Sequence, residues 1–489
     1  MTGSSVTVPG TGANPVTVAL GTGDVLHLAT QIGALLSTIP GSLGAQGDLT
    51  VTGGTYGSPI DPAPVLPRTT VSELILAGDG TTGAATIPAG YNYVIDQNSS
   101  SVAGSSTISG SNLALITGTV GGTFQVTGQS TVAAEGGNNL ITAAGQYLIS
   151  TAPGNNTIAA SGAGTVASST GHNLIAVSGV NVVDSFGQDI IVAEAGLTTV
   201  NAASAGSIVF GSPNGQSFLA VSVTGAQDTV SASTSNTTVT LAGSHDWVFG
   251  GQAGAGTLSV LDMGANDTVA ALSSPTTVTA GAGSTGLFVF GGSGSLTFVG
   301  GASASTVLGG TGSDNITGGS GGLFIGTRAN DTITGQAAGG ATVFGSDGHN
   351  VTYLGAGNLL YAAGVGNETL NAAASSGSNA LFATGATSAS IVGGTGSNLF
   401  DAGAGADTFT GGSGSNAYFF LASNTAGAHD FITNLAASDQ VGLIGYNQAL
   451  STITVTGGSA TLTLSDKTQI TFVNVSNITN NIHYLNPNA

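Results

Sequence analysis

Cysteine is absent from the 489-residue sequence, and lysine and arginine together number only three. The absence of cysteine excludes disulfide staples, zinc–thiolate sites and thiol catalysis. The three basic residues, Arg68, Arg328 and Lys467, stand against 23 acidic residues, which gives a formal net charge of -20. A chain with so few cations cannot neutralise a row of phosphates, so no nucleic-acid partner is expected.

Long apolar runs are also missing. No stretch approaches the roughly 18 apolar residues of a membrane-spanning helix, so no transmembrane segment is expected. The first residues, 1–6, have neither the basic segment nor the apolar segment of a cleaved signal peptide. We therefore expect that any export of this chain uses a route without a cleaved N-terminal signal.

Charged residues make up only 5% of the sequence and proline contributes 12 residues, whereas glycine contributes 82 and hydrophobic residues reach 40%. A disordered chain would be polar and highly charged. Collagen would need glycine at every third position and much more proline. The remaining composition of Val, Thr, Ile, Ala, Ser and Gly favours β-structure over helix.

Residues from about 70 to 425 repeat a short unit. Apolar runs alternate with turns that contain Gly and either Asn or Asp, and the first turn residues are 17 residues apart. Self-similarity at this period, built of strands and turns, predicts a parallel β-solenoid in which each coil is buried by its neighbours. The repeated turn residues are Asn139, Asn156, Asn173, Asp189, Asp228, Asp246, Asp267, Asp314, Asp331, Asn350 and Asn367.

A Val-Phe-Gly step or a close relative also recurs, and we expect its Phe and Val side chains to form internal columns. The Phe residues of this step are Phe210, Phe249, Phe290 and Phe344. Glycine supplies the positive φ angles that the corners of such coils need.

Two flanking regions differ from the repeats. Residues 1–67 contain one amphipathic segment, from Asp24 to Ile39, which predicts a short helix, and they end in a proline-rich segment that indicates an extended linker. Residues 426–489 contain two alternating segments around Gly457 and Gly458, which predict a β-hairpin with one buried face. We expect three domains: an N-terminal region (1–67), a solenoid (68–425) and a β-rich C-terminal cap (426–489).

The most specific motif lies between Gly393 and Phe419, where three nonapeptides, GGTGSNLFD, AGAGADTFT and GGSGSNAYF, follow one another. A related nonapeptide, GGTGSDNIT, spans residues 309–317. These segments resemble the calcium-binding repeats of the RTX family, whose pattern is G-G-x-G-x-D/N-x-U-x. The resemblance implies an elongated all-β parallel β-roll with bound Ca²⁺, secreted by a type I system.

The resemblance also implies calcium ligands. The best carboxylates are Asp314 and Asp407, with Asp331 next and Asp401, at the last position of its nonapeptide, a weaker candidate. Carbonyl oxygens of the Gly-rich turns would complete each shell, because Ca²⁺ prefers oxygen ligands. The glycines concerned are Gly310, Gly312, Gly394, Gly396, Gly405 and Gly412.

Many turns carry Asn where the family pattern has Asp. An amide is a poorer calcium ligand than a carboxylate, but it can hydrogen-bond to the same amide one coil away. We therefore expect sparse calcium near residues 309–331 and 393–412, and metal-free Asn ladders elsewhere. The Asn residues at turn positions are Asn139, Asn156, Asn173, Asn350, Asn398 and Asn416.

Catalytic patterns are weak. There is no His-Glu-x-x-His zinc motif and no nucleophile elbow between a strand and a helix. The adjacent pairs His245-Asp246 and His429-Asp430 are expected to point to opposite faces of a strand and to belong to solvated turns. The chain is therefore not expected to be an enzyme.

The favoured hypothesis is a secreted structural protein at the bacterial cell surface, which assembles into a homo-oligomer, a surface layer or an extracellular fibre. A second hypothesis is an ice-binding or cell-surface glycan-binding solenoid, suggested by four Thr-x-Thr steps. A polysaccharide-modifying enzyme is a third. The Thr-x-Thr steps are Thr238/Thr240, Thr277/Thr279, Thr332/Thr334 and Thr461/Thr463.

Overall fold

The computed structural model describes residues 4–485 except for 10–14, 21–23, 39–48, 66–70, 78–82, 98–105, 119, 214–216, 253–255, 327–330, 336–338, 346–349, 354 and 386. The chain is an all-β parallel β-solenoid of about 18 turns with only 4% helix, as the sequence predicted. It divides into two compact units, Met1–Val239 and Thr240–Ala489, and each is described by itself.

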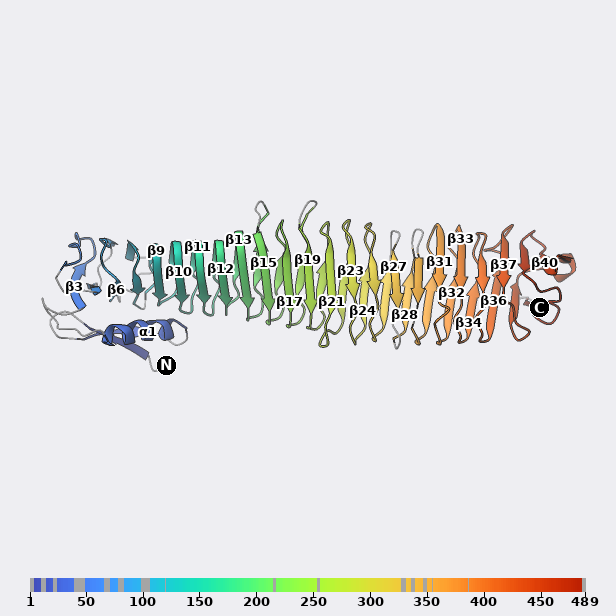
Figure 1. Ribbon diagram of the computed structural model, residues 1–489, viewed down its shortest axis with the longest axis horizontal. Helices are drawn as coiled ribbons and strands as arrows, with labels where there is room; N and C mark the ends of the chain where they lie inside the picture. Colours follow the sequence, from blue (N-terminus) through green and yellow to red (C-terminus); the bar gives the residue numbers. More distant parts are fainter. Residues whose placement is uncertain are drawn as a thin grey trace. The chain divides into compact units, whose positions relative to one another are not determined.

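The first unit combines a small N-terminal layer with a stack of parallel strands (Figure 1). Its elements are β1 (Ser4–Val8), β2 (Val16–Leu20), α1 (Asp24–Thr38), β3 (Leu49–Thr55), β4 (Val71–Ala77), β5 (Gly83–Thr86), β6 (Tyr93–Asp96), β7 (Ser106–Ser111), β8 (Ala114–Ile116), β9 (Thr123–Ala134), β10 (Leu140–Thr151), β11 (Thr157–Ser168), β12 (Leu174–Ser185), β13 (Ile190–Ala202), β14 (Ile208–Gly211), β15 (Ser217–Val223) and β16 (Thr229–Ser231).

Long strands bent at a glycine form the middle of this unit. Strands β9 to β13 pair in parallel, and a glycine stands at the same register position in each. These glycines have positive φ, and a Cβ on Gly162 would lie 2.1 Å from the carbonyl oxygen of Gly145. The corner of each coil therefore requires glycine for both its backbone conformation and its close approach to the next coil. The glycine column contains Gly128, Gly145, Gly162, Gly179 and Gly196.

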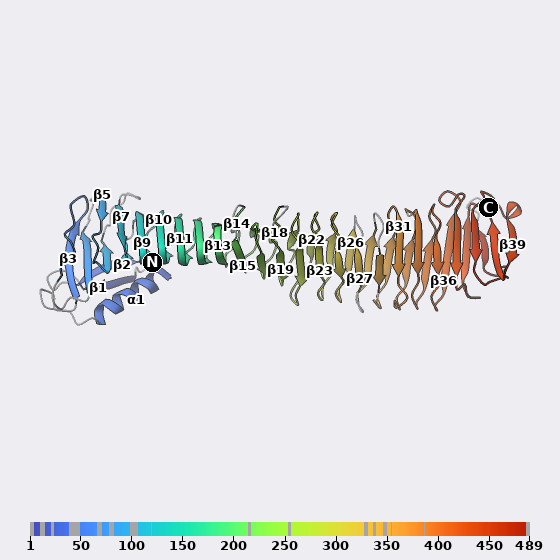
Figure 2. The ribbon, with the colours of Figure 1, turned by 45° about the horizontal axis from the view of Figure 1, so that its top comes forward.

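The helix predicted over Asp24 to Ile39 is observed as α1, and it does not stand alone. Together with the antiparallel β1–β2 hairpin it covers the outer face of the first strands (Figure 2). Leu28, Ile32 and Leu36 of α1 belong to one buried cluster with Ile75 and Ile95 of the sheet. The amphipathic face thus packs against the side of the stack.

The parallel stack begins within the predicted N-terminal region. Strand β3 pairs in parallel with β4 in the register Leu49↔Val71. In the sequence, the proline-rich segment therefore lies between two neighbouring strands of the stack and does not precede the stack. Arg68 lies outside the described residues.

The second unit is built from two parallel sheets (Figure 1). Strand β17 (Thr237–Leu241) contains the division between the units, and the second unit continues with β18 (Trp247–Phe249), β19 (Leu258–Asp262), β20 (Thr268–Ala270), β21 (Thr276–Ala280), β22 (Leu287–Phe290), β23 (Leu296–Val299), β24 (Ser305–Leu308), β25 (Asn315–Thr317), β26 (Leu323–Gly326), β27 (Thr332–Gly335), β28 (Ala341–Phe344), β29 (Asn350–Tyr353) and β30 (Leu359–Ala362).

It ends with β31 (Asn367–Asn371), β32 (Asn379–Phe382), β33 (Ser388–Val392), β34 (Asn398–Asp401), β35 (Thr408–Thr410), β36 (Asn416–Leu421), β37 (His429–Thr433), β38 (Gln440–Ile444), the 3-10 helix η2 (Gln448–Leu450), β39 (Thr452–Thr456), β40 (Ser459–Thr463), β41 (Gln469–Phe472) and β42 (Ile482–Leu485). From β18 to β38, even-numbered strands pair with even-numbered ones and odd-numbered strands with odd-numbered ones.

One column of inward-facing side chains from each sheet fills the second unit. The even-strand column begins with valine and ends with aromatic residues and Val441, and all of these side chains are buried. Phe400 and Tyr418 stack with their ring centroids 4.8 Å apart. The even-strand column contains Val248, Val269, Val289, Val307, Ile325, Val343, Tyr361, Leu381, Phe400, Tyr418 and Val441.

The prediction that the Val-Phe-Gly phenylalanines form internal columns is wrong for the Phe residues. Phe210, Phe290 and Phe344 are 42%, 38% and 41% exposed, whereas the preceding valines are buried. Successive side chains of a strand point to opposite faces, so a buried Val places the following Phe outside. The sequence step was recognised correctly, but its two residues cannot share one face.

The predicted C-terminal hairpin is present as antiparallel β39 and β40, joined at Gly457 and Gly458, which have positive φ. The prediction that one face of this hairpin is buried holds for only one of its two strands. Strand β40 alternates between buried and less buried residues, but all five residues of β39 are exposed. In the part of the chain that the structure describes, no helix has the length and apolar character needed to cross a bilayer.

Candidate metal sites

Polar turn residues stack above one another where the coils enter their strands. In the second unit they form two ladders. The even-strand ladder has two polar stretches, Asp246 and Asp267, and then Asn379, Asn398, Asn416 and Asp439. The coils between them carry Leu287, Ser305, Leu323, Ala341 and Leu359 at this position. The odd-strand ladder contains Asp314 and Asp331, then Glu368, and, beyond Ala389, Asp407 and Asp430. The predicted ligands Asp314, Asp331 and Asp407 thus belong to one ladder, and the neighbouring Asn nonapeptides belong to the other.

In the first unit, the Asn residues at the turn position of successive coils, here called Asn rungs, hydrogen-bond to one another, as predicted. The amide of Asn139 donates to Oδ1 of Asn156 at 2.9 Å, and Asn156 donates to Asn173 at 2.9 Å. The row ends on Asp189, which accepts from Asn173 at 2.7 Å and from the hydroxyl of Ser185 at 2.7 Å. The side-chain oxygens of these turn residues thus accept hydrogen bonds from donors of the protein itself.

The same solution occurs in the nonapeptides that carry Asn. Nδ2 of Asn398 donates to the carbonyl oxygens of Gly394 and Gly396 at 2.9 and 3.1 Å. Asn416 donates in the same way to Gly412 at 3.1 Å. Three of the carbonyls expected as calcium ligands, those of Gly394, Gly396 and Gly412, therefore accept a hydrogen bond from an Asn amide.

An aspartate at the same position cannot donate these bonds. Asp314 accepts through Oδ1 from the backbone N–H of Leu296 at 2.9 Å and through Oδ2 from Gly310 at 3.1 Å. The backbone N–H of Asp314 in turn donates to Oδ1 of Asp331 at 2.9 Å. An ionised carboxylate only accepts hydrogen bonds, so the carbonyls of such a turn have no side-chain donor from this residue.

Oxygens from two coils converge beside Gly309. The position that a Cβ would take there lies 3.1 Å from Oδ2 of Asp314, 3.4 Å from Oδ2 of Asp331 and 3.4 Å from the carbonyl oxygen of Gly326. Two carboxylates and a carbonyl around one point are the oxygen donors that Ca²⁺ prefers. The predicted residues Asp314 and Asp331 are thus brought together, and Gly309 leaves the space between them open.

Asp407 is linked to Asp430 by the same backbone hydrogen bond that links Asp314 to Asp331. Asp407 accepts from the backbone of Ala389 at 2.8 Å and of Gly403 at 3.0 Å, and its own N–H donates to Oδ1 of Asp430 at 2.9 Å. Burial raises the pKa of Asp430 to about 7, although the hydrogen bond from the backbone N–H of Asp407 lowers it. Oδ2 of Asp430 has no hydrogen-bond partner among the described residues.

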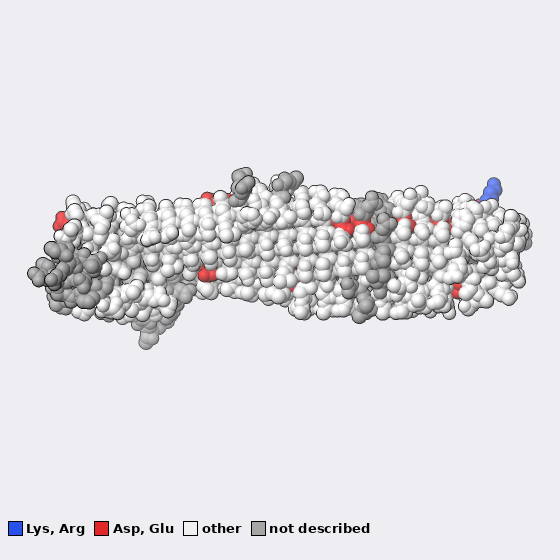
Figure 3. Space-filling view, in the orientation of Figure 1, with Lys and Arg blue, Asp and Glu red and all other residues white. Residues whose placement is uncertain are grey.

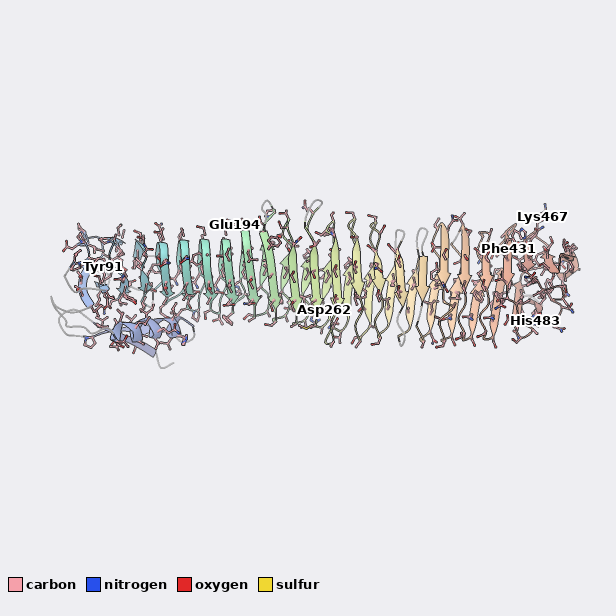
Figure 4. The ribbon with its side chains drawn as sticks, in the orientation of Figure 1. Tyr91, Glu194, Asp262, Phe431, Lys467 and His483 are labelled. Carbon is pink, nitrogen blue, oxygen red and sulfur yellow. The ribbon has the colours of Figure 1, made fainter. Side chains whose placement is uncertain are left out.

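The expectation that Asp246 and Asp430 belong to solvated turns is wrong, because both are buried. The expectation of opposite faces holds: His429 is exposed and stacks on Phe431, whereas Asp430 points inward (Figure 4 labels Phe431). A buried Asp at the start of a strand belongs to a ladder and not to an acid–base pair with its neighbour.

A further stacked pair, Asp246 and Asp267, consists of turn residues that the sequence did not single out as candidate ligands. Asp267 accepts from the backbone N–H of Asp246 at 2.8 Å, and its pKa is raised to about 8 by burial and by the adjacent Asp262 (Figure 4). His245 and Asn266, each just before the ladder aspartate, have positive φ. This Gly-x-x-Asp turn lacks the Gly-Gly of the nonapeptide, which is why the pattern was missed.

Asp401 and the remaining glycines are placed as follows. Asp401 lies on the outer face of β34, between Phe382 and Phe419 in register, and away from the odd-strand ladder. Gly310 and Gly312 stack directly on the carbonyls of Gly292 and Gly294, and Gly405 lies in the turn that leads to Asp407. Burial raises the pKa of Asp401, as it does for Asp314 and Asp407.

Few side chains are available to neutralise these carboxylates. In the described part of the chain fourteen acidic residues are buried, and acidic atoms are sparse on the face that Figure 3 shows. Only three Lys and Arg residues exist in the sequence, and Arg328 lies outside the described residues. Among the residues described, no three His, Asp or Glu side chains gather at one point. Cation binding would therefore combine paired aspartates with backbone carbonyls.

The family model for the RTX calcium-binding nonapeptide repeat matches residues 290–322 and 384–417. These ranges contain Asp314 and Asp407, and they indicate that the chain binds Ca²⁺. No curated protein and no solved structure shows a significant match to the chain. The partners of the two aspartates, Asp331 and Asp430, lie outside the matched ranges and are identified by the stacking of the coils.

Proposed function

We propose that this RTX-type β-roll protein is a calcium-stabilised structural protein that functions outside the cell by assembling with copies of itself. In this proposal Ca²⁺ is held by the pairs Asp314/Asp331 and Asp407/Asp430 in the odd-strand ladder. The bound ions join successive coils and offset the charge of buried carboxylates, so the solenoid is complete only where calcium is abundant.

The observation that carries the proposal is the contrast between Asn and Asp rungs. Asn398 bonds the turn carbonyls with its own amide, whereas Asp314 and Asp331 bring two carboxylates and a carbonyl to one point. Burial of an ionised carboxylate without a compensating charge is unfavourable. A divalent cation at the Asp rungs would neutralise the two carboxylates, whereas the Asn rungs are uncharged and need no counter-ion.

An extracellular location follows from the same chemistry. RTX repeats are typical of secreted proteins, and extracellular calcium sites in general bind in the range of about 10⁻⁴ to 10⁻³ M. At low calcium the buried aspartates would repel one another, which would favour the unfolded chain before secretion. The structural role is supported by the extent of the repeat, whose described coils are filled by apolar columns.

The glycan- and ice-binding alternative is not favoured by the arrangement of threonines. In the odd-numbered sheet, the outer column runs Thr277, Thr297, Asn315 and Thr332, so the rank of Thr is interrupted. A flat regular Thr array would need the same residue on every coil. The threonine steps are therefore explained by β-propensity on an outer face.

Removal of calcium tests the proposal. We expect the purified chain to be folded and assembled at millimolar calcium and to lose both properties in excess chelator, as measured by circular dichroism, light scattering and electron microscopy. Re-addition of calcium should restore them, and magnesium should be a weaker substitute because it demands octahedral geometry. A chain that stays monomeric at every calcium concentration would overturn the assembly part of the proposal.

A further inference from the structure

The C-terminal hairpin leaves one strand edge open. Strand β39 pairs with β40 on one side, in the register Thr452↔Thr463 to Thr456↔Ser459, and has no other strand partner among the described residues. Figure 2 shows it as the outermost labelled strand at this end of the second unit. An edge strand presents unpaired N–H and C=O groups, which readily pair with another chain.

The apolar face of the hairpin continues onto this open edge. Ile453 and Val455 lie opposite Leu462 and Ala460 of β40, and opposite residues of an antiparallel pair share a face. Leu462 and Ala460 are buried, but Ile453 and Val455 are 52% and 55% exposed. The apolar face that is buried on β40 therefore continues onto β39, where its side chains are exposed to solvent.

The devices that usually protect an edge are missing. Soluble proteins block exposed edges with Lys, Pro or inward-pointing charges. Residues 440–465 contain no charged residue and no proline, although the whole chain carries a net charge of -20. The nearest charges in the sequence, Asp466 and Lys467, cancel formally, and Figure 4 labels Lys467 at this end. Two copies that meet here avoid the repulsion that their acidic coils would cause.

The strand is also complementary to itself. Residues 452–456 read Thr-Ile-Thr-Val-Thr, which is nearly symmetric about Thr454. In an antiparallel pair centred on this residue, Thr454 meets its own copy, Ile453 meets Val455, and Thr452 meets Thr456. One face of such a pair is aliphatic and the other is threonine, and both kinds of cross-strand pair are favourable.

We propose that β39 pairs antiparallel with β39 of a second copy about a two-fold axis at Thr454. This inference rests on the proposed assembly and names the contact at one end of the second unit. A two-fold contact is closed, so by itself it gives a dimer. It is also small compared with the roughly 1,600 Å² of a standard interface, so a larger assembly would use it together with other contacts.

Single-cysteine variants give a direct test, because the chain has no cysteine of its own. Directly opposite residues of an antiparallel pair have Cα atoms about 4.5–5.5 Å apart, within the range of a disulfide. Full-length Thr454→Cys should form a disulfide-linked dimer at millimolar calcium at least about tenfold faster than Gln448→Cys. Gln448 is exposed in η2, just before the strand, and is the matched control.

A charge exchange at the same position provides a second test. Thr454→Lys and Thr454→Glu should each abolish the dimer, because like charges would lie directly opposite each other. An equimolar mixture of the two variants should restore it as a mixed dimer, which mass spectrometry can distinguish. Circular dichroism should match the unmodified chain, so that a folding defect is separated from lost pairing.

The outcomes separate this inference from the proposed function. If the unmodified chain assembles but Thr454→Cys cross-links no faster than Gln448→Cys, or if the mixed variants do not pair, the β39 contact is wrong and assembly uses another surface. If the unmodified chain remains monomeric at millimolar calcium, the assembly proposal itself fails.

Discussion

At the turn position of each coil, Asn and Asp make different sets of hydrogen bonds. Asn398 donates to two carbonyls of its own turn and to the amide oxygen of Asn416 one coil away. Asp314 and Asp407 accept two backbone N–H bonds each and donate none from the side chain. The choice between the two residues therefore decides whether the turn carbonyls receive hydrogen bonds from the side chain, and we propose that the Asp turns bind a cation instead.

Replacement of the aspartates tests this difference. Asp314→Asn and Asp407→Asn should keep the fold, bind less calcium and lose less stability in chelator than the unmodified chain. At a hundredfold excess over its Kd, a lost site removes about 2.7 kcal/mol of calcium-dependent stabilisation. Calorimetric titration and chemical unfolding measure the two effects. Asp184→Asn, on the outer face of β12, is the control and should leave calcium binding unchanged.

The reciprocal change should have the opposite effect. Asn398→Asp removes the amide that bonds Gly394 and Gly396 and adds a buried charge. We expect this variant to be destabilised in chelator by about 1–3 kcal/mol, the usual cost of leaving buried groups unpaired. Calcium should recover part of the loss in thermal melts. Equal loss with and without calcium would contradict the exchange of amide for metal.

Glu73 is a buried acid without a hydrogen-bond partner in the described residues. It lies on the face of β4 that the N-terminal layer covers, beside Tyr93 in register, and burial raises its pKa to about 8. The folded state thus binds a proton that the unfolded state releases near pH 4.5, so its contribution to stability falls as the pH rises from about 4.5 to 8.

Glu73→Gln should remove this dependence. The variant should be more stable than the unmodified chain at pH 9, by about 1–4 kcal/mol, and nearly equal to it at pH 4. The difference between the two unfolding curves across this range isolates Glu73 from the other buried acids. Parallel pH profiles for the two proteins would show that the carboxyl group is not protonated in the folded chain.

At the scale of an element, glycine determines how closely the long strands β9 to β13 can stack. Gly162→Ala would place a methyl group 2.1 Å from the carbonyl oxygen of Gly145, at a φ of 120°. We expect a loss of more than about 2 kcal/mol in the free energy of unfolding, because both strain and overpacking result. Gly137→Ala is the control, since its nearest contact would be 3.5 Å and its φ is not positive. An equal effect of both changes on denaturant unfolding would refute the argument.

At the scale of the whole molecule, charge and calcium are coupled. The chain has a net charge of -20, and many of its acids are buried in the coils. Such a charge opposes compaction by self-repulsion, and bound Ca²⁺ reduces it. The melting temperature should therefore rise steadily with the logarithm of calcium concentration above Kd. Differential scanning calorimetry checks this, and a melting temperature independent of calcium would contradict it.

The sequence by itself determined the solenoid and the hydrogen-bonded Asn residues Asn139, Asn156, Asn173, Asn398 and Asn416. Gly-rich turns at a constant spacing permit little except stacked coils, because each coil must bury its apolar residues against the next. The amphipathic pattern of residues 24–39 likewise determined α1, and the alternation around Gly457 determined the hairpin.

Only the tertiary structure decided which residues meet. The coils differ in length, so sequence distance does not show that Asp407 stacks on Asp430 and not on Asn416. Burial likewise depends on what packs against each face. Phe290 is exposed because Val289 points inward. Strand β39 is exposed because, among the described strands, it pairs only with β40 and has an open edge on its other side. Local pattern determines the period of a strand, but the neighbouring coil determines which oxygen atoms lie side by side.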